Sequence, residues 1–242
     1  MTPEELVSTT AAKINSLGAI YYFDRATIAH GKEHLDLDGM RFYFIGRGGV
    51  LGDVESPVVT AAFGYFAPAV VDKMWNTSKA KVAPRDAARA ALECNATLGR
   101  GKLDDMAGLT EFCAAAEQVV ATVNPAGLQL YAAVAAEPLP EDLPGRAMQL
   151  AVIHRELRGS AHLAAVIAAG VHPSVAHAIR RPNDIATFGW PEDLVITDAD
   201  RANLEASDAA TDKMSAGHYA GLSNEQRSAF AAGIDAMSDI LL

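Results

Sequence analysis

The stretch that most constrains the fold is an apolar, aromatic run at residues 42–75, which reads FYFIGRGGVLGDVESPVVTAAFGYFAPAVVDKMW. Its single arginine, Arg47, stands between glycines, and Pro68 lies in its last third. Because proline is favoured in the first turn of a helix, the stretch predicts a helix, a turn and a second helix that begins at Pro68. A weaker copy lies at residues 154–179, where Pro173 opens the next helix after an apolar segment.

Helix is the expected state for most of the chain. Half of the residues are apolar, and long alternating runs of β-branched residues are few. Capping boxes at Thr2, Thr197 and Ser223 indicate three helix starts. Further helices are expected at residues 24–34, 84–98, 109–123, 145–157, 160–169 and 173–180. Residues 181–196 are expected to form a loop, with room for a short strand at 194–196.

Short matches recur in the same order about a hundred residues apart, which is the signature of an internal repeat. DLDG at residues 36–39 recurs as DLPG at 142–145, and AGLT at 107–110 recurs as AGLS at 220–223. Three prolines within residues 138–144 mark the best position for a linker. We therefore expect two repeats, residues 1–137 and 138–242, that bury their apolar faces against each other as an intramolecular pseudo-dimer.

The charge balance disfavours two classes of partner. Lysine and arginine number 20 against 30 acidic residues, a net charge of −10. Binding to the phosphate backbone depends on lysine and arginine, so DNA is a possible but disfavoured partner, and an anionic membrane surface is disfavoured too. The two cysteines, Cys94 and Cys113, are expected to be reduced and buried, which favours a cytoplasmic protein. In solution we expect a pseudo-dimeric monomer or a homodimer.

The best candidate for a binding site is a set of charged residues with apolar neighbours. Arg155 and Arg158 lie one turn apart on a predicted helix, and Arg158 shares its face with His162. If the side chains of Arg155, Arg158 and His162 point towards Arg47, the four residues form a cationic pocket for a carboxylate or phosphate. The expected walls and charged members are Tyr43, Arg47, Phe63, Tyr65, Phe66, Arg155, Glu156, Arg158 and His162. In a second interpretation, Arg47 and Glu156 form a structural ion pair that joins the repeats.

Three weaker patterns allow other sites. His30 and His34 flank a glutamate in an H-x-x-E-H pattern, although a solvated helix end explains them better. The glycines of residues 46–52 do not follow a dinucleotide-binding spacing, and close packing of two segments explains them better than an anion nest. His154 or His162 is a candidate haem or metal ligand, which leaves both the cofactor and any catalytic activity open.

The chain resembles the SalK-type helix-turn-helix family, bacterial proteins related to MarR regulators. In the first half the resemblance rests on Phe42, Phe44, Gly46, Arg47, Leu51, Gly52, residues 58–61, Phe63, Phe66 and Pro68. In the second half it rests on Arg155, Glu156, Arg158, Gly159, His162, Gly189, Trp190, Thr211 and Asp212. The resemblance implies a mostly helical fold of tandem winged-helix-like repeats. Two departures are a short segment at 191–196, where the family has a longer helix and a wing, and Leu157 in place of a histidine.

Three functions follow from these features. We favour a MarR-like protein that binds a small organic ligand between its repeats. The second is a transcriptional regulator that reads DNA with residues 173–181, through Ser174, His177, Arg180 and Arg181. The third is an enzyme or haem-binding protein that has reused the fold.

Overall fold

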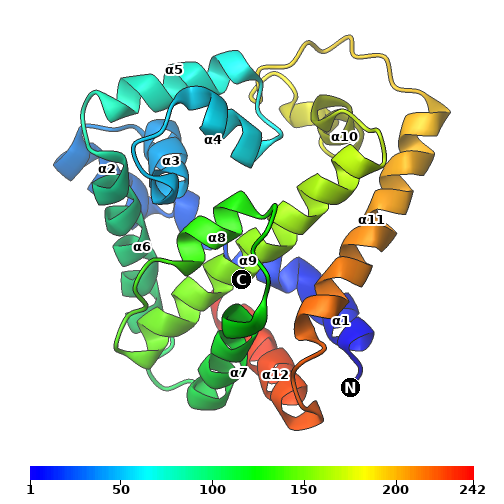
Figure 1. The fold of residues 1–242 in the computed structure, drawn as a ribbon. Coiled ribbons are helices and arrows are strands. Elements are labelled where there is room, and N and C mark those ends of the chain that lie inside the picture. The colour runs from blue at the N-terminus through cyan, green and yellow to red at the C-terminus, as the bar shows by residue number, and fades with distance from the viewer.

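The computed structural model describes residues 1–242 and contains only helices (Figure 1). The first part of the chain forms α1 (Pro3–Leu17), η1 (Ile20–Phe23), α2 (Arg25–Leu35), α3 (Gly39–Gly48), η2 (Gly49–Leu51), α4 (Ser56–Phe63), α5 (Pro68–Lys79) and α6 (Pro84–Arg100). The rest forms α7 (Leu109–Thr122), α8 (Gln129–Ala135), α9 (Leu143–Ala168), α10 (Pro173–Arg180), η3 (Pro182–Asp184), α11 (Asp198–Tyr219) and α12 (Asn224–Leu241). The prediction of a mostly helical protein is confirmed.

The short strand that the sequence allowed at residues 194–196 does not form. A strand needs a partner for its backbone hydrogen bonds, and no other segment of the chain is in a strand. For the same reason there is no wing, which would require a β-hairpin. The helices are therefore present without the β part of a winged-helix fold.

Local capping signals place the helix starts where the sequence indicates them. Thr2, Thr197 and Ser223 each form a complete capping box, with a side-chain oxygen accepting from the third helical residue. Pro68 and Pro173 both stand in the first turn of their helices, α5 and α10. These signals depend only on residues that are close in sequence. The helix starts can therefore be predicted before the tertiary structure is known.

Helix α9 is one continuous helix of 26 residues, whereas the sequence predicted separate helices at 145–157 and 160–169. A glycine inside a helix costs about 1 kcal/mol, and Gly159 is the residue at which the break was expected. That cost is outweighed because buried apolar residues flank it on both sides, from Leu150 to Val166. Continuity places Arg155, Arg158 and His162 on one stripe of α9, as predicted.

Helix α9 lies at the centre of the molecule and packs against α1, α6, α7, α8 and α11 (Figure 1). One core of 46 buried residues runs from Leu6 to Met237 and thus draws on both predicted repeats. The proline-rich segment before α9 is held to it, because Gln149 Nε2 donates to the Pro138 carbonyl at 3.0 Å. The division at residue 137 stays a prediction.

A second, small core forms at the far end of α9. Val166 and Val171 pack there with Ala176 of α10 and Leu204 of α11, apart from the main core. Helix α10 turns back from α9 at 112°. No helix alone combines the length and the apolar character needed to cross a bilayer, and α9 with α10 meets both requirements only as this bent pair.

Candidate functional site

A cavity of about 720 Å³ lies between two groups of helices. η1, α3 and α4 contribute one side, and α9, α10 and α11 contribute the other. All nine residues of the predicted pocket line it, namely Tyr43, Arg47, Phe63, Tyr65, Phe66, Arg155, Glu156, Arg158 and His162. Residues more than a hundred positions apart therefore meet at one cavity, and whether they bind a ligand stays a prediction.

Glu156 is the centre of a buried polar cluster in the cavity wall. Its two carboxylate oxygens accept from Arg47, with Nε to Oε1 and Nη2 to Oε2 both at 2.9 Å. Oε1 also accepts from Arg155 Nη1 at 2.5 Å and from the Tyr22 hydroxyl at 3.2 Å. This is the ion pair that the second interpretation of the sequence expected between the two halves of the chain. The fork-to-fork geometry fixes both side chains.

The cluster contains two positive charges, on Arg47 and Arg155, and one negative charge, on Glu156. Burial by itself would raise the pKa of Glu156, but Arg47 and then Arg155 lower that pKa to about 2. Burial would lower the pKa of Arg47, but the Glu156 carboxylate raises it well above its ordinary value. With one carboxylate between two guanidinium groups, the cluster has a net charge of +1 at neutral pH.

Aromatic rings form the wall beside this cluster. The Arg47 guanidinium lies 4.5 Å from the centre of the Phe63 ring, and its Nη1 donates to the Tyr43 hydroxyl at 3.1 Å. Phe66 stacks on Phe188 with ring centres 4.0 Å apart. The wall is therefore apolar and flat next to a buried positive charge.

The cavity is cationic although the whole protein is acidic. Five arginines line it, namely Arg47, Arg155, Arg158, Arg180 and Arg181. Only three carboxylates line it with them, Glu156, Asp184 and Asp208. Five positive charges minus three negative charges leave +2 in a chain whose net charge is −10. An electrostatic surplus of this sign favours an anion.

Comparison with known proteins gives the family. The model of a helix-turn-helix family matches residues 7–185, which is most of the chain. The chain belongs to this helix-turn-helix family. No curated protein or solved structure matches it. The narrower SalK-type assignment stays a prediction.

The far end of the cavity in this helix-turn-helix protein contains polar side chains around His162. His162 Nδ1 lies 3.1 Å from the Thr211 hydroxyl, and its ring stacks on Tyr65 with ring centres 6.3 Å apart. Burial, followed by the nearby positive charges of Arg158 and Arg180, lowers the pKa of His162 to about 4. His162 is therefore neutral at pH 7.

His154, the other predicted haem or metal ligand, lies away from the cavity. Its ring is buried, with Nδ1 3.0 Å from the Tyr219 hydroxyl and Nε2 3.2 Å from the Ala116 carbonyl. Because both ring nitrogens already have partners, neither is free to coordinate a metal. No group of three or more His, Cys, Asp or Glu side chains in the chain is placed to hold a metal ion.

Acidification is expected to destabilise the protein through its buried histidines. Burial lowers the folded-state pKa of His154 to about 4, against about 6.5 in an unfolded chain. The unfolded state thus binds more protons between these values, and stability falls as pH drops through that window. For His154 the loss between pH 7 and pH 5 is roughly 2 kcal/mol. Urea unfolding at both pH values measures it, and in His154→Gln the fall should shrink by about that amount. An equal fall in both proteins would contradict this.

The four residues predicted to read DNA lie on or next to α10, and the structure separates them into two pairs. Ser174 and His177 are buried, and His177 packs its ring on Phe188 with ring centres 3.8 Å apart. Arg180 and Arg181 are exposed, with carboxylate partners in Asp208 and Asp184. Only the last turn of α10 could reach a base edge in this arrangement.

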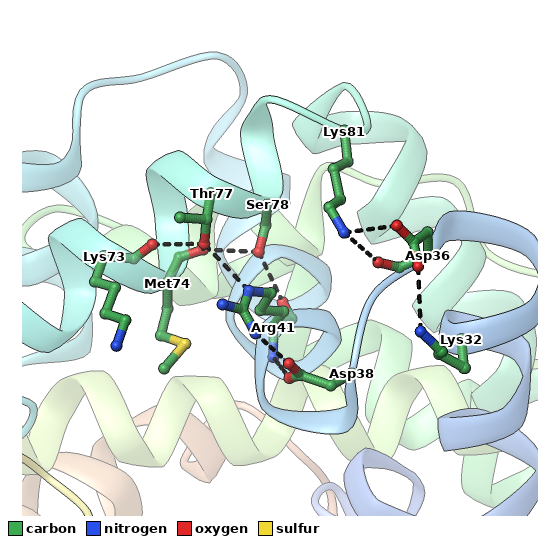
Figure 2. A network of polar contacts seen from close by, with 9 residues as sticks. All are labelled: Lys32, Asp36, Asp38, Arg41, Lys73, Met74, Thr77, Ser78 and Lys81. Atoms are coloured by element: carbon green, nitrogen blue, oxygen red, sulfur yellow. Dashed lines mark hydrogen bonds and ion pairs between the residues drawn. The ribbon is translucent and has the colours of Figure 1, made fainter.

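Helices α4 and α5 pack against each other across a short turn, and α5 is more exposed than α10. Lys73, Asn76 and Thr77 lie on the solvent face of α5, and Lys73 forms no ion pair. Figure 2 shows a contact between the C-terminal turn of α5 and α3, in which Arg41 Nε donates to the Thr77 hydroxyl at 3.3 Å. In the same view Lys81 pairs with Asp36 at 2.8 Å, so part of the positive charge here is already balanced.

Several residues of the site escaped the sequence analysis, among them Tyr22, Phe188 and Asp208. Tyr22 lies in η1, and Phe188 lies in a segment that reads as a loop, so neither belongs to a periodic pattern. Asp208 lies on α11, where an acidic residue reads as part of a solvated face. Only the packing of these segments against α3, α4 and α9 brings them to the cavity.

Proposed function

We propose that this helix-turn-helix family protein binds a small organic anion with an aromatic body in the cavity between α3, α4, α9 and α10. The observation that supports it best is the position of Arg155. Its Nη1 contacts Glu156 at 2.5 Å and Tyr22 at 3.4 Å, while its Nη2 donates to no group of the protein. An anion in the cavity would complete the hydrogen bonds of Arg155 and balance the surplus charge.

Size and lining agree with this proposal. Ligand cavities commonly measure about 300–1,000 Å³ and combine apolar walls with a few polar groups. Here the rings of Phe63, Phe66 and Phe188 supply flat apolar contact, and Arg47 is already neutralised by Glu156. Within the buried cluster, the charge of Arg155 is thus the one most available to a ligand.

The position of the cavity also fits a signalling role. Its lining comes from η1, α3 and α4 in the proposed first repeat and from α9, α10 and α11 in the proposed second repeat. A ligand that contacts both sides favours one relative orientation of the two repeats. The shift in population is limited by the difference in the ligand's affinity for the two orientations. We infer a MarR-like mechanism in which occupancy of the cavity changes the relative setting of the repeats.

The test uses 2-naphthoate and its neutral analogue 2-naphthalenemethanol as probes in isothermal titration calorimetry. We expect 2-naphthoate to bind with one site per chain and more tightly than the alcohol. A hydrogen bond to a charged group contributes about 1.5–3 kcal/mol, so Arg155→Gln should weaken 2-naphthoate roughly 10- to 100-fold. The affinity for 2-naphthalenemethanol should change little in the same variant.

Arg89→Gln is the matched control, because Arg89 is an exposed arginine on α6 that does not line the cavity. It should leave both affinities unchanged. The proposal fails if neither probe binds the folded protein, or if Arg155→Gln and Arg89→Gln have equal effects on 2-naphthoate.

DNA binding is the second candidate, supported by the family and by the exposed face of α5 with Lys73, Asn76 and Thr77. Against it stand the net charge of −10 and the carboxylate partners of Arg41 and Lys81. Retention on heparin that salt releases, and that Lys73→Ala weakens, would favour this function.

A further inference from the structure

The cavity has two polar ends that α9 holds at a fixed separation. Arg155 and His162 lie on the same stripe of this helix, seven residues apart. At a rise of 1.5 Å per residue, the two positions are about 10 Å apart along the axis. One continuous helix carries both, so this spacing does not depend on a loop.

The two ends differ in charge balance, because the arginines near His162 each pair with a carboxylate. These pairs are Arg158 with Asp212, Arg180 with Asp208 and Arg181 with Asp184. The Arg155 end holds the net positive cluster around Glu156. At the other end, Tyr65 stacks on His162, and His177 lies on α10 beside the small core against which Tyr65 packs. Burial raises the pKa of Tyr65 to about 12, and burial followed by Arg181 lowers the pKa of His177. These groups are neutral hydrogen-bonding partners at pH 7.

Two polar atoms at the neutral end have no partner. The Tyr65 hydroxyl and His177 Nε2 are both shielded from solvent, and neither makes a hydrogen bond within the protein. Leaving such a group unpaired costs about 1–3 kcal/mol. Both residues line the cavity, and His177 is only 6% exposed. The two unpaired atoms therefore belong to side chains that line the cavity.

Flat apolar surface connects the two ends. Phe63 lies beside Arg47 at the cationic end, and Phe66 stacks on Phe188, which in turn packs on His177 at the neutral end. A ligand that spans this distance is in contact with rings along its length. Rigid aromatic ligands suit such a wall because they lose little conformational entropy on binding.

We propose that the ligand is an elongated aromatic acid with a hydroxyl group at the end opposite its carboxylate. Its carboxylate binds Arg155, and its hydroxyl reaches Tyr65 and His177. The inference rests on the proposed binding of an organic anion and specifies the class of that anion.

The test compares 6-hydroxy-2-naphthoate with 2-naphthoate by titration calorimetry. A neutral hydrogen bond contributes about 0.5–1.5 kcal/mol net, so the distal hydroxyl should tighten binding roughly 2- to 10-fold. Tyr65→Phe and His177→Phe keep the rings and remove the polar atoms. In the double variant we expect the advantage of the hydroxyl to disappear, while the affinity for 2-naphthoate stays the same.

The isomer 3-hydroxy-2-naphthoate is the matched control, because its hydroxyl lies beside the acid and does not reach the neutral end. Its affinity should not respond to the double variant. If 2-naphthoate binds through Arg155 but the distal hydroxyl adds nothing, the inference is wrong and the proposed function stands. If neither naphthoate binds, both are wrong. Circular dichroism of each variant establishes that it is folded.

Discussion

Glu156→Ala is expected to destabilise the folded protein by about 3–5 kcal/mol, which is the usual cost of removing one partner from a buried ion pair. The substitution leaves Arg47 and Arg155 facing the same space without a carboxylate. It also removes the acceptor of the Tyr22 hydroxyl. Two like charges and a hydroxyl without an acceptor would then be buried together. Urea unfolding at pH 7, followed by circular dichroism, measures the loss.

Arg155→Gln is the informative comparison for Glu156→Ala. It removes the surplus charge and leaves the Arg47 to Glu156 pair, with both contacts at 2.9 Å, intact. The loss of stability should therefore be much smaller than for Glu156→Ala, although both substitutions alter the same cluster. Equal losses would show that the cluster depends on its number of contacts and not on its charge balance. Such a contrast would separate the proposed role of Arg155 in ligand binding from the role of Glu156 in stability.

Gly49→Ala is expected to lower stability by about 3 kcal/mol, the upper part of the range for overpacking. A Cβ at this position would lie 2.0 Å from the Pro84 carbonyl oxygen and 2.7 Å from its carbon, both backbone atoms at the start of α6. The backbone of η2 or α6 must move to relieve that contact. In a chain of this size the melting temperature should fall by roughly 6–12 °C, which a thermal scan detects.

Gly217→Ala is the matched control. Gly217 lies in the last turn of α11, and nothing lies within 4 Å of a Cβ added there. It should raise stability by about 0.8–1.0 kcal/mol, the difference in helix propensity between the two residues. Opposite signs for the two variants would show that Gly49 is needed for close approach. If Gly49→Ala instead kept full stability and lost affinity for 2-naphthoate, an anion nest at residues 46–52 would be the better explanation.

Most of the helix starts could be predicted from the sequence, because their causes are local. A capping box needs only residues three positions apart, as at Thr2 and Ser223, and Pro68 and Pro173 act at their own positions. Helical spacing likewise placed Arg155, Arg158 and His162 on one face before any packing was known. These parts of the candidate site depend on neighbours in the chain alone.

Other features depend on segments that are distant in sequence. Helix α9 continues through Gly159 because buried contacts on both sides outweigh a local preference. A wing is missing because residues 194–196 find no strand to pair with. The sequence allows His154 as a metal ligand, but the fold places Tyr219 and Ala116 at its two ring nitrogens. Local sequence thus determined where helices begin and which side chains share a face. The tertiary structure alone decided which buried charges meet, because burial and pairing are set by residues far apart in the chain.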